Sequence, residues 1–214
     1  NGSWEQEVPI IGINAQVSRP LTATAKDGRS LSFTAPRDYT TFAGRPDKVT
    51  EWKNAELVFI GYGIDAPEQN WDDYKGVDLT GKVALVMNND PSDDPNLFAG
   101  KTRLYYGRWS YKYEEAARRG AVGVIVIHTT PSAGYPFQVI QTGQGQERFW
   151  LPFTNGEKTL AIRSWCSEDA AKSLVALGGH DLDELRGKAE TRAFRPVQIG
   201  VTVDVETTNT IREI

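Results

Sequence analysis

Short apolar runs separated by turn residues dominate the hydrophobic pattern of this chain, and they predict a fold rich in β-strands. In chain order, the predicted strands cover residues 7–17, 21–25, 31–34, 55–61, 82–87, 122–127, 159–164 and 197–206. The last of these runs alternates apolar and polar residues, which is typical of a half-buried strand. Asp27-Gly28 separates two of the early runs and predicts a hairpin turn. The segment 63–76 is too polar and interrupted for a long helix.

One amphipathic helix is expected between the strands at 82–87 and 122–127. Ser110 is a candidate N-cap, and Gly120 is placed where a helix would end. The face that packs on the sheet is expected to hold Trp109, Tyr113, Ala116, Ala117 and Gly120. Strand, helix and strand in this order predict a βαβ unit with parallel strands and a right-handed crossover. Two further helices are expected after Ser167 and Asp181, because each residue can cap a helix and acidic residues follow it.

Composition places the chain among ordinary globular proteins of one large or two small domains. It has 214 residues, of which 39% are hydrophobic and 24% charged. No apolar run approaches the roughly 20 residues that cross a bilayer. The net charge is −4 without a basic block, so the sequence does not predict nucleic-acid binding. One cysteine excludes an intrachain disulfide, and residues 1–4 lack the basic and apolar regions of a signal peptide.

Residues that commonly act as nucleophiles, bases or metal ligands are sparse. The chain has two histidines, His128 and His180, and one cysteine, Cys166, without a metal-binding spacing. His128 ends a predicted buried strand, where α/β sheets often place functional residues, and a hydrogen-bonded structural histidine is the alternative. His180 is expected in an exposed loop, and Cys166 is expected to be buried. No catalytic residue, cofactor site or metal site is therefore predicted.

An acid-rich loop follows the predicted strand at 82–87. It reads NNDPSDDP over residues 88–95, and the segment from Asp90 to Asp94 offers oxygen ligands of the kind that calcium prefers. The loop lacks the glycine and the distal glutamate of an EF-hand, and a solvated turn is the alternative. Whether it binds calcium stays open at this point.

Aromatic and cationic residues crowd the segment from 103 to 113. These seven residues are Arg103, Tyr105, Tyr106, Arg108, Trp109, Tyr111 and Tyr113. They exceed what one helix face can pack, and tyrosine, tryptophan and arginine are enriched at contact surfaces. With Trp109 and Tyr113 assigned to packing, Tyr106, Arg108 and Tyr111 are expected to point elsewhere. These three are the candidates for contact with a substrate.

Residues 55–165 resemble the protease-associated (PA) domain, in the form that is inserted into bacterial di-zinc aminopeptidases and related peptidases. The resemblance is carried by FIGYGI at 59–64, WDDYKGVDLTGKV at 71–83, YGRWSYKYEEAARRGA at 106–121 and VIHTTP at 126–131. Residues 2–4 resemble the point where such peptidases leave the catalytic domain, and residues 208–211 the point where they re-enter it. The two ends of the chain are therefore expected to lie together, with the strands at 7–17 and 197–206 as neighbours.

The resemblance implies an α/β (α+β) fold, with a β-rich sheet or open barrel, a βαβ unit, two or three flanking helices and extra terminal strands. It implies three segments: a β-rich flank over 1–54, the PA core over 55–165, and two short helices with a closing strand over 166–214.

The resemblance also implies a function without catalysis. In this family the peptidase domain supplies two zinc ions, usually held from a His-x-Asp motif that this chain lacks. The implied role is to border the active site and to restrict or contact peptide substrates, with the catalytic domain of the same chain as partner. The implied location is periplasmic, cell-envelope or secreted. The alternatives are an autonomous protein-interaction domain and a free-standing hydrolase built from His128 and the acid-rich loop.

Overall fold

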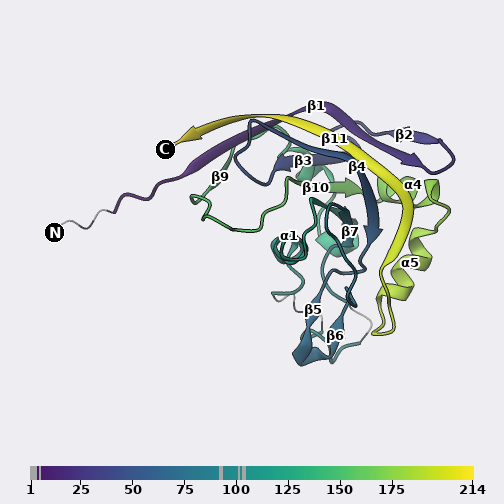
Figure 1. Cartoon of the computed structure of the whole chain (residues 1–214). Helices are drawn as coiled ribbons and strands as arrows, with labels where there is room; N and C mark the ends of the chain where they lie inside the picture. The colour runs from purple at the N-terminus through teal and green to yellow at the C-terminus, as the bar shows by residue number, and fades with distance from the viewer. Residues whose placement is uncertain (1–3, 5, 92–93, 101, 103–104) are drawn as a thin grey trace.

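Within the residues that the computed structural model describes (4, 6–91, 94–100, 102 and 105–214), one open nine-stranded sheet forms the frame of the molecule (Figure 1). The strands follow the order β2-β1-β11-β4-β7-β8-β10-β3, and β9 pairs with β1. Their bounds are β1 Ile11–Ala25, β2 Ser30–Ser32, β3 Tyr39–Ala43, β4 Val49–Phe59, β7 Val83–Met87, β8 Gly123–His128, β9 Arg148–Trp150, β10 Ile162–Ser167 and β11 Val197–Glu213. A small second sheet joins β5 (Asp65–Ala66) to β6 (Trp71–Asp72), with the 3₁₀ helix η1 (Pro67–Gln69) between them. This mixed α/β fold, with a mostly β sheet that does not close into a barrel, is the predicted fold class.

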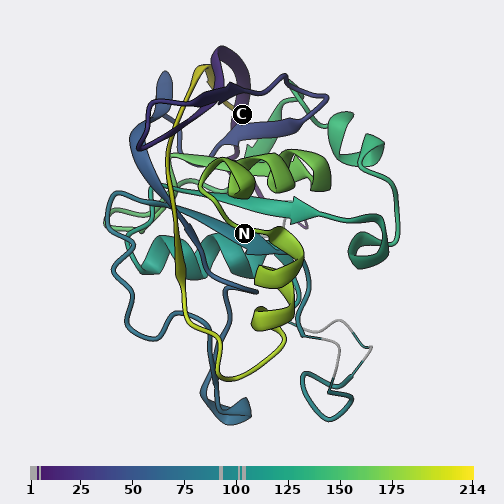
Figure 2. The same cartoon turned by 90° about the vertical axis from the view of Figure 1, so that its right-hand side faces the viewer.

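Four parallel strands, β4, β7, β8 and β10, form the middle of the sheet. The helices are α1 (Trp109–Arg118), α2 (Thr130–Ala133), α3 (Gln138–Gln141), α4 (Glu168–Leu177) and α5 (Leu182–Ala189). Figure 2 shows α4 and α5 in front of the parallel strands. Because α1 connects β7 to the parallel strand β8, the predicted βαβ unit is confirmed.

Alternate side chains of β8 point to opposite faces of the sheet, as the pleat of a strand requires. Val124 and Val126 belong to the same apolar cluster as Ala116 of α1, whereas Ile125 and Ile127 share a cluster with Leu174 of α4. A fully buried side chain of this size contributes about 1.5–3 kcal/mol to stability. The helices α1 and α4 therefore hold the parallel strands from opposite sides.

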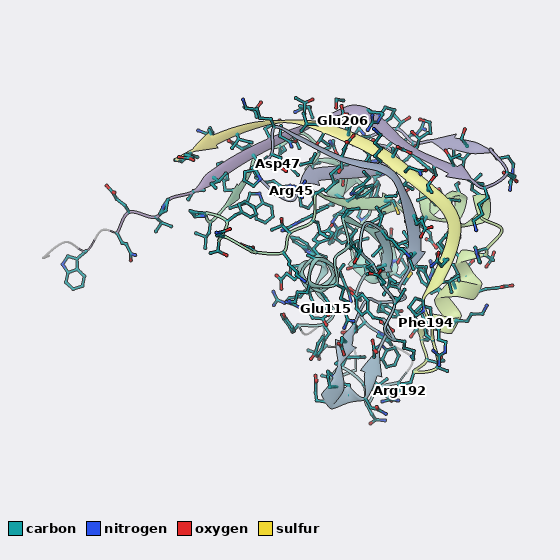
Figure 3. All side chains as sticks on the ribbon, viewed as in Figure 1. Arg45, Asp47, Glu115, Arg192, Phe194 and Glu206 are labelled. Carbon is teal, nitrogen blue, oxygen red and sulfur yellow. The ribbon has the colours of Figure 1, made fainter. Side chains whose placement is uncertain are left out.

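A long antiparallel ribbon of β1 and β11 extends from this body, and the start of β1 lies beside the end of β11 at its tip (Figure 1). At its tip, Ile10 and Ile214 exchange two backbone hydrogen bonds, of 3.0 and 2.9 Å. The prediction that these two strands are neighbours is confirmed. Residues 1–3, for which the same prediction expected a position near the C-terminal end, lie outside the described part. Along the ribbon, Glu206 accepts a hydrogen bond from Ser18 (2.7 Å), and Figure 3 marks Glu206 on β11.

The small sheet lies at the opposite end of the molecule from the ribbon's bend, next to the loop between α5 and β11. Figure 3 shows Arg192 and Phe194 of that loop beside β5 and β6. Lys75 Nζ donates to the backbone carbonyls of Arg192 (2.7 Å) and Phe194 (2.6 Å), and the Phe194 ring packs edge-on against Phe59 at 5.7 Å. The loop is thereby fixed to the core.

Several local predictions hold, and others are corrected. Ser167 and Asp181 cap α4 and α5 as predicted, and Gly28 lies in the left-handed region at the hairpin between β1 and β2. The N-cap position of α1 is Arg108 and not Ser110, and Arg108 makes no side-chain cap hydrogen bond. The strands expected at 7–17 and 21–25 form one strand with irregular register, and that expected at 159–164 begins at Ile162. The sequence pattern did not predict β3, β9, α2 or α3. No described helix is long and apolar enough to cross a membrane.

Candidate functional site: a crevice at the carboxyl edge of the parallel strands

A crevice of about 640 Å³ lies outside the carboxyl ends of β7 and β8. The loops that follow β7, β8 and β10 line it together with α5, through residues that include Asn88, Asn89, Asp90, Thr129, Ser132, Glu168, Asp183, Arg186 and Glu190. Because α1 and α4 lie on opposite faces of the sheet, the loops that lead to them separate at this edge. Open α/β sheets bind ligands at such a position.

Ion pairs fix the wall of the crevice that α5 forms. Arg186 reaches Glu168 at 2.9 Å and Asp183 at 3.2 Å, so it connects α5 to the start of α4. The hydrogen bond from Arg186 holds the pKa of the Glu168 carboxyl below its usual value. Lys172 of α4 also reaches Glu168 at 3.5 Å and Asp183 at 3.9 Å, so two cations face these two carboxylates.

Behind the crevice, Lys112 of α1 is completely buried. Its ammonium donates to the backbone carbonyls of Asn89 (2.6 Å) and Tyr106 (2.8 Å). Burial lowers the pKa of Lys112 to about 7, and the nearby carboxylates of Asp73 and Asp90 act in the opposite direction. Lys112 thus ties the loop after β7 to the segment before α1. Sequence reasoning missed this role, although the position of Lys112 one helical turn before Ala116 on the packed face was a signal.

A second, smaller pocket of about 260 Å³ adjoins the crevice at the start of α1. It is called the α1 pocket here, and its lining residues are Asn88, Gly107, Arg108, Trp109 and Tyr135. Asn88 lines both spaces and so forms their common wall. The side chain of Arg108 is exposed, and it makes no hydrogen bond or ion pair with any residue in the described part of the chain.

The three candidate contact residues lie in different environments. Arg108 lines the α1 pocket, whereas Tyr106 is half-buried and lines none of the pockets described above. Tyr111 is only 3% exposed, and its hydroxyl donates to the backbone carbonyl of Asp65 (3.1 Å). Arg103, from the same segment, lies outside the described residues.

The expected packing of the α1 face is therefore wrong for two aromatic residues. Trp109, assigned to the core, is 43% exposed, and Tyr111, expected to point outward, is buried. Trp109 is the first residue of α1, and its ring meets Tyr113 at 5.8 Å and Trp165 at 6.4 Å without being fully covered. The rings of Tyr105 and Tyr106 pack against Tyr111, at centroid distances of 5.0 and 5.1 Å, and so give it a second apolar layer.

The two histidines lie at opposite ends of α4. His128 pairs in register with Ser167, which caps the start of this helix, and His180 follows its end. Ten helical residues span about 15 Å, so the two imidazoles cannot share a zinc ion. His128 is 2% exposed, burial lowers its pKa, and Nε2 has no hydrogen-bond partner among the described residues. Backbone hydrogen bonds at His128 and Tyr135 act on this pKa in the opposite direction, which fits the alternative of a hydrogen-bonded structural histidine.

The remaining candidate groups also stay apart. Cys166 is fully buried, as predicted, and burial raises the pKa of its thiol. In the acid-rich loop, Asp94 accepts a hydrogen bond from the backbone amide of Asn96 (2.9 Å), and Asp93 lies outside the described residues. The described residues bring together no group of three His, Cys, Asp or Glu side chains that could hold a metal ion. Zinc therefore does not fit the residues that the structure describes.

Comparisons with known proteins give similarity at the level of structure. No family model matches the chain, and no curated protein matches its sequence. An aminopeptidase from Aneurinibacillus sp. strain AM-1 aligns with 97% of this chain and 36% of its own length, at 18% identity and a TM-score of 0.41. BSAP, a zinc aminopeptidase from Bacillus subtilis, aligns with 95% of this chain and 33% of its own length, at 14% identity and a TM-score of 0.34. The chain thus spans about a third of the length of these bacterial enzymes.

Proposed function

We propose that this chain is a noncatalytic PA-like domain of a secreted or cell-envelope zinc-dependent aminopeptidase, where it borders the active site and contacts or restricts peptide substrates. The observation that carries the proposal is the exposed, unpaired Arg108 beside the half-exposed Trp109, at the ligand-binding edge of a parallel sheet. Arginine and tryptophan are the side chains that dominate binding at protein contact surfaces. The sequence resemblance over residues 55–165 supplies the peptidase context.

The ribbon of β1 and β11 gives independent support. Its ends meet where Ile10 pairs with Ile214, so the chain enters and leaves the body at one place. An inserted domain needs this arrangement, because it has to leave and rejoin its host at neighbouring points. In the proposed protein, two zinc ions in the peptidase domain supply the hydrolytic chemistry. The residues of this chain bind and orient the peptide and limit its access to that centre.

An exposed apolar group at the tip of the ribbon favours a contact with another protein surface. Val8, Phe149 and Ile214 are exposed here, and β9 brings Phe149 beside the start of β1. We assign this tip to the contact with the peptidase domain of the same chain. The second candidate function, an autonomous protein-interaction domain, would use the same apolar tip for a separate partner.

The proposal is tested by asking whether the chain binds peptides without cleaving them. The chain is titrated calorimetrically with tri- to hexapeptides, and the same mixtures are analysed for cleavage by mass spectrometry, with and without added zinc. The proposal predicts reversible binding and no cleavage in either condition. Zinc-dependent cleavage by the purified chain would contradict the noncatalytic role, and absence of binding to every peptide would contradict the contact role.

A further inference from the structure

We propose that the α1 pocket binds a carboxylate group of a peptide, through the start of α1, Arg108 and Asn88. This inference deepens the proposed function and rests on it, because it names the chemical group that the domain recognises.

The start of α1 presents uncapped backbone amides to the pocket. The residue at the N-cap, Arg108, makes no side-chain cap hydrogen bond, and the first turn contains no acidic residue. The first N–H groups of a helix lack partners within the helix, and the helix dipole makes this end favourable for a negative charge. Both α4 and α5, in contrast, begin with a side-chain cap and acidic residues in the first turn. The start of α1 therefore suits an external anion.

Asn88 is the second, independent feature of the pocket. Its residue surface is only 4% exposed, yet its carboxamide hydrogen-bonds to none of the described residues, and it lines the pocket. Buried polar groups almost always have a partner. An unpaired carboxamide in this position can donate from its NH₂ group to an oxygen atom of a ligand.

Arg108 supplies the charge and the geometry. Its guanidinium is not neutralised by any described carboxylate, so its planar pair of N–H donors is available for a bidentate contact. Among the described residues, Arg186, the arginine that lines the adjoining crevice, is already held by Glu168 and Asp183. Arg108 is thus the guanidinium at this pocket that remains free to recognise an anion.

The walls and the surroundings favour a carboxylate over a phosphate. Trp109 and Tyr135 provide aromatic surfaces on which the apolar part of an amino-acid residue can lie. One arginine matches a single negative charge, whereas a phosphate dianion would need further cations. In the adjoining crevice, Arg186 is already paired with Glu168 and Asp183, so it is not free to balance a second negative charge. A peptide with one carboxylate near a neutral or basic residue fits both spaces.

The test compares peptides that differ only in the carboxylate. Calorimetric titration of the chain uses Gly-Ala-Glu-Ala-amide, its Gln counterpart, the Gln peptide with a free C-terminal carboxylate, and inorganic phosphate. The expected result is that one of the carboxylate peptides binds about tenfold more tightly than the neutral peptide, the gain from one charge-assisted contact. The first and third peptides distinguish a side-chain from a terminal carboxylate.

Arg108→Gln is expected to abolish this preference, and the matched control is Arg195→Gln. Arg195 is also exposed and unpaired among the described residues, but it lies in the loop before β11, away from the pocket. A second variant, Asn88→Asp, places a negative charge inside the pocket and is expected to weaken binding of the carboxylate peptide. The indole N–H resonance of Trp109, identified by its loss in Trp109→Phe, should shift only with the peptide that binds. Thermal unfolding checks that each variant is folded.

The outcomes separate the two proposals. Equal binding of carboxylate and neutral peptides, or a preference that survives Arg108→Gln, overturns the carboxylate site and leaves the proposed peptide contact standing. Tighter binding of phosphate than of either carboxylate peptide also overturns it. Failure of the unmodified chain to bind any peptide overturns the proposed contact function itself.

Discussion

Lys112 Nζ donates a 2.6 Å hydrogen bond to the backbone carbonyl of Asn89 in a region where the lysine side chain is completely buried. A buried ammonium is costly unless its hydrogen bonds are satisfied. Here the carbonyls of Asn89 and Tyr106 both accept, and they belong to the two segments that flank the candidate site. The lysine therefore holds the floor of the crevice to α1.

Replacing this lysine should destabilise the domain. Lys112→Met keeps the length of the side chain but leaves two buried carbonyls without their donor, so a loss of roughly 2–4 kcal/mol is expected. Chemical denaturation at pH 10, where the folded lysine is uncharged and the cost of burying its charge is small, measures this loss. Lys26→Met, at an exposed lysine, is the matched control and should change stability by less than about 0.5 kcal/mol. Equal stability of the two variants would show that the buried hydrogen bonds do not matter.

The same lysine should make stability depend on pH above neutrality. Burial lowers its pKa from 10.5 to about 7, so between these values the folded protein holds fewer protons at Lys112 than the unfolded chain does. The free energy of unfolding should therefore increase as the pH rises from about 7 to 10.5. Burial raises the pKa of Asp73 from 3.8 to about 7, so the folded and unfolded states differ in the protonation of Asp73 mainly below pH 7. Asp73 therefore does not cause the rise in stability expected between pH 7 and 10. Denaturation of wild type and Lys112→Met from pH 7 to 10 should show this rise in wild type alone, and parallel curves would contradict it.

Replacing each of two glycines by alanine should change the stability of the domain in opposite directions. A Cβ at Gly123 of β8 would lie 2.1 Å from Nε1 of the buried Trp52, so Gly123→Ala should cost about 3 kcal/mol or more. Gly187 lies inside α5 with no atom within 4 Å of an added Cβ, so Gly187→Ala should stabilise by about 0.5–1 kcal/mol. Thermal unfolding of both variants tests the close approach of Trp52 to β8. A neutral Gly123→Ala would contradict it.

The chain alone should not bind zinc tightly. Its two histidines lie at opposite ends of α4, and Cys166 is buried, so a closed tetrahedral site has too few ligands within reach. Calorimetric titration at neutral pH should show no stoichiometric sub-micromolar binding. Stoichiometric sub-micromolar binding would overturn this prediction.

Local signals in the sequence predicted much of the body, because each acts over a few residues. The cap at Ser167, the stop at Gly120 and the apolar run of β8 depend on neighbours in the chain, and they agree with the structure. The short strands β3 and β9 lack such a signal, since each is defined by its pairing with a distant strand.

The candidate site was predicted only in part for the same reason. Arg108 emerged from composition alone, but its pocket depends on Asn88 and Tyr135, which come from separate loops. The expected helix face placed Trp109 inside and Tyr111 outside. Trp109 is instead the exposed first residue of α1, and Tyr111 is buried against the segment at Asp65. Lys112 was missed because a lysine is ordinarily exposed on a helix.

The central claim, that this domain contacts peptides in an aminopeptidase, is tested most directly by the dependence of KM on peptide length in the proposed full-length enzyme. Arg108→Ala should raise KM for tetra- to hexapeptides about tenfold, the loss expected for a charge-assisted contact, while kcat, which the proposal assigns to zinc in the peptidase domain, changes little. Arg195→Ala is the control and should leave KM as it is. An unchanged KM together with a lowered melting temperature in Arg108→Ala would contradict the claim and make Arg108 a structural residue.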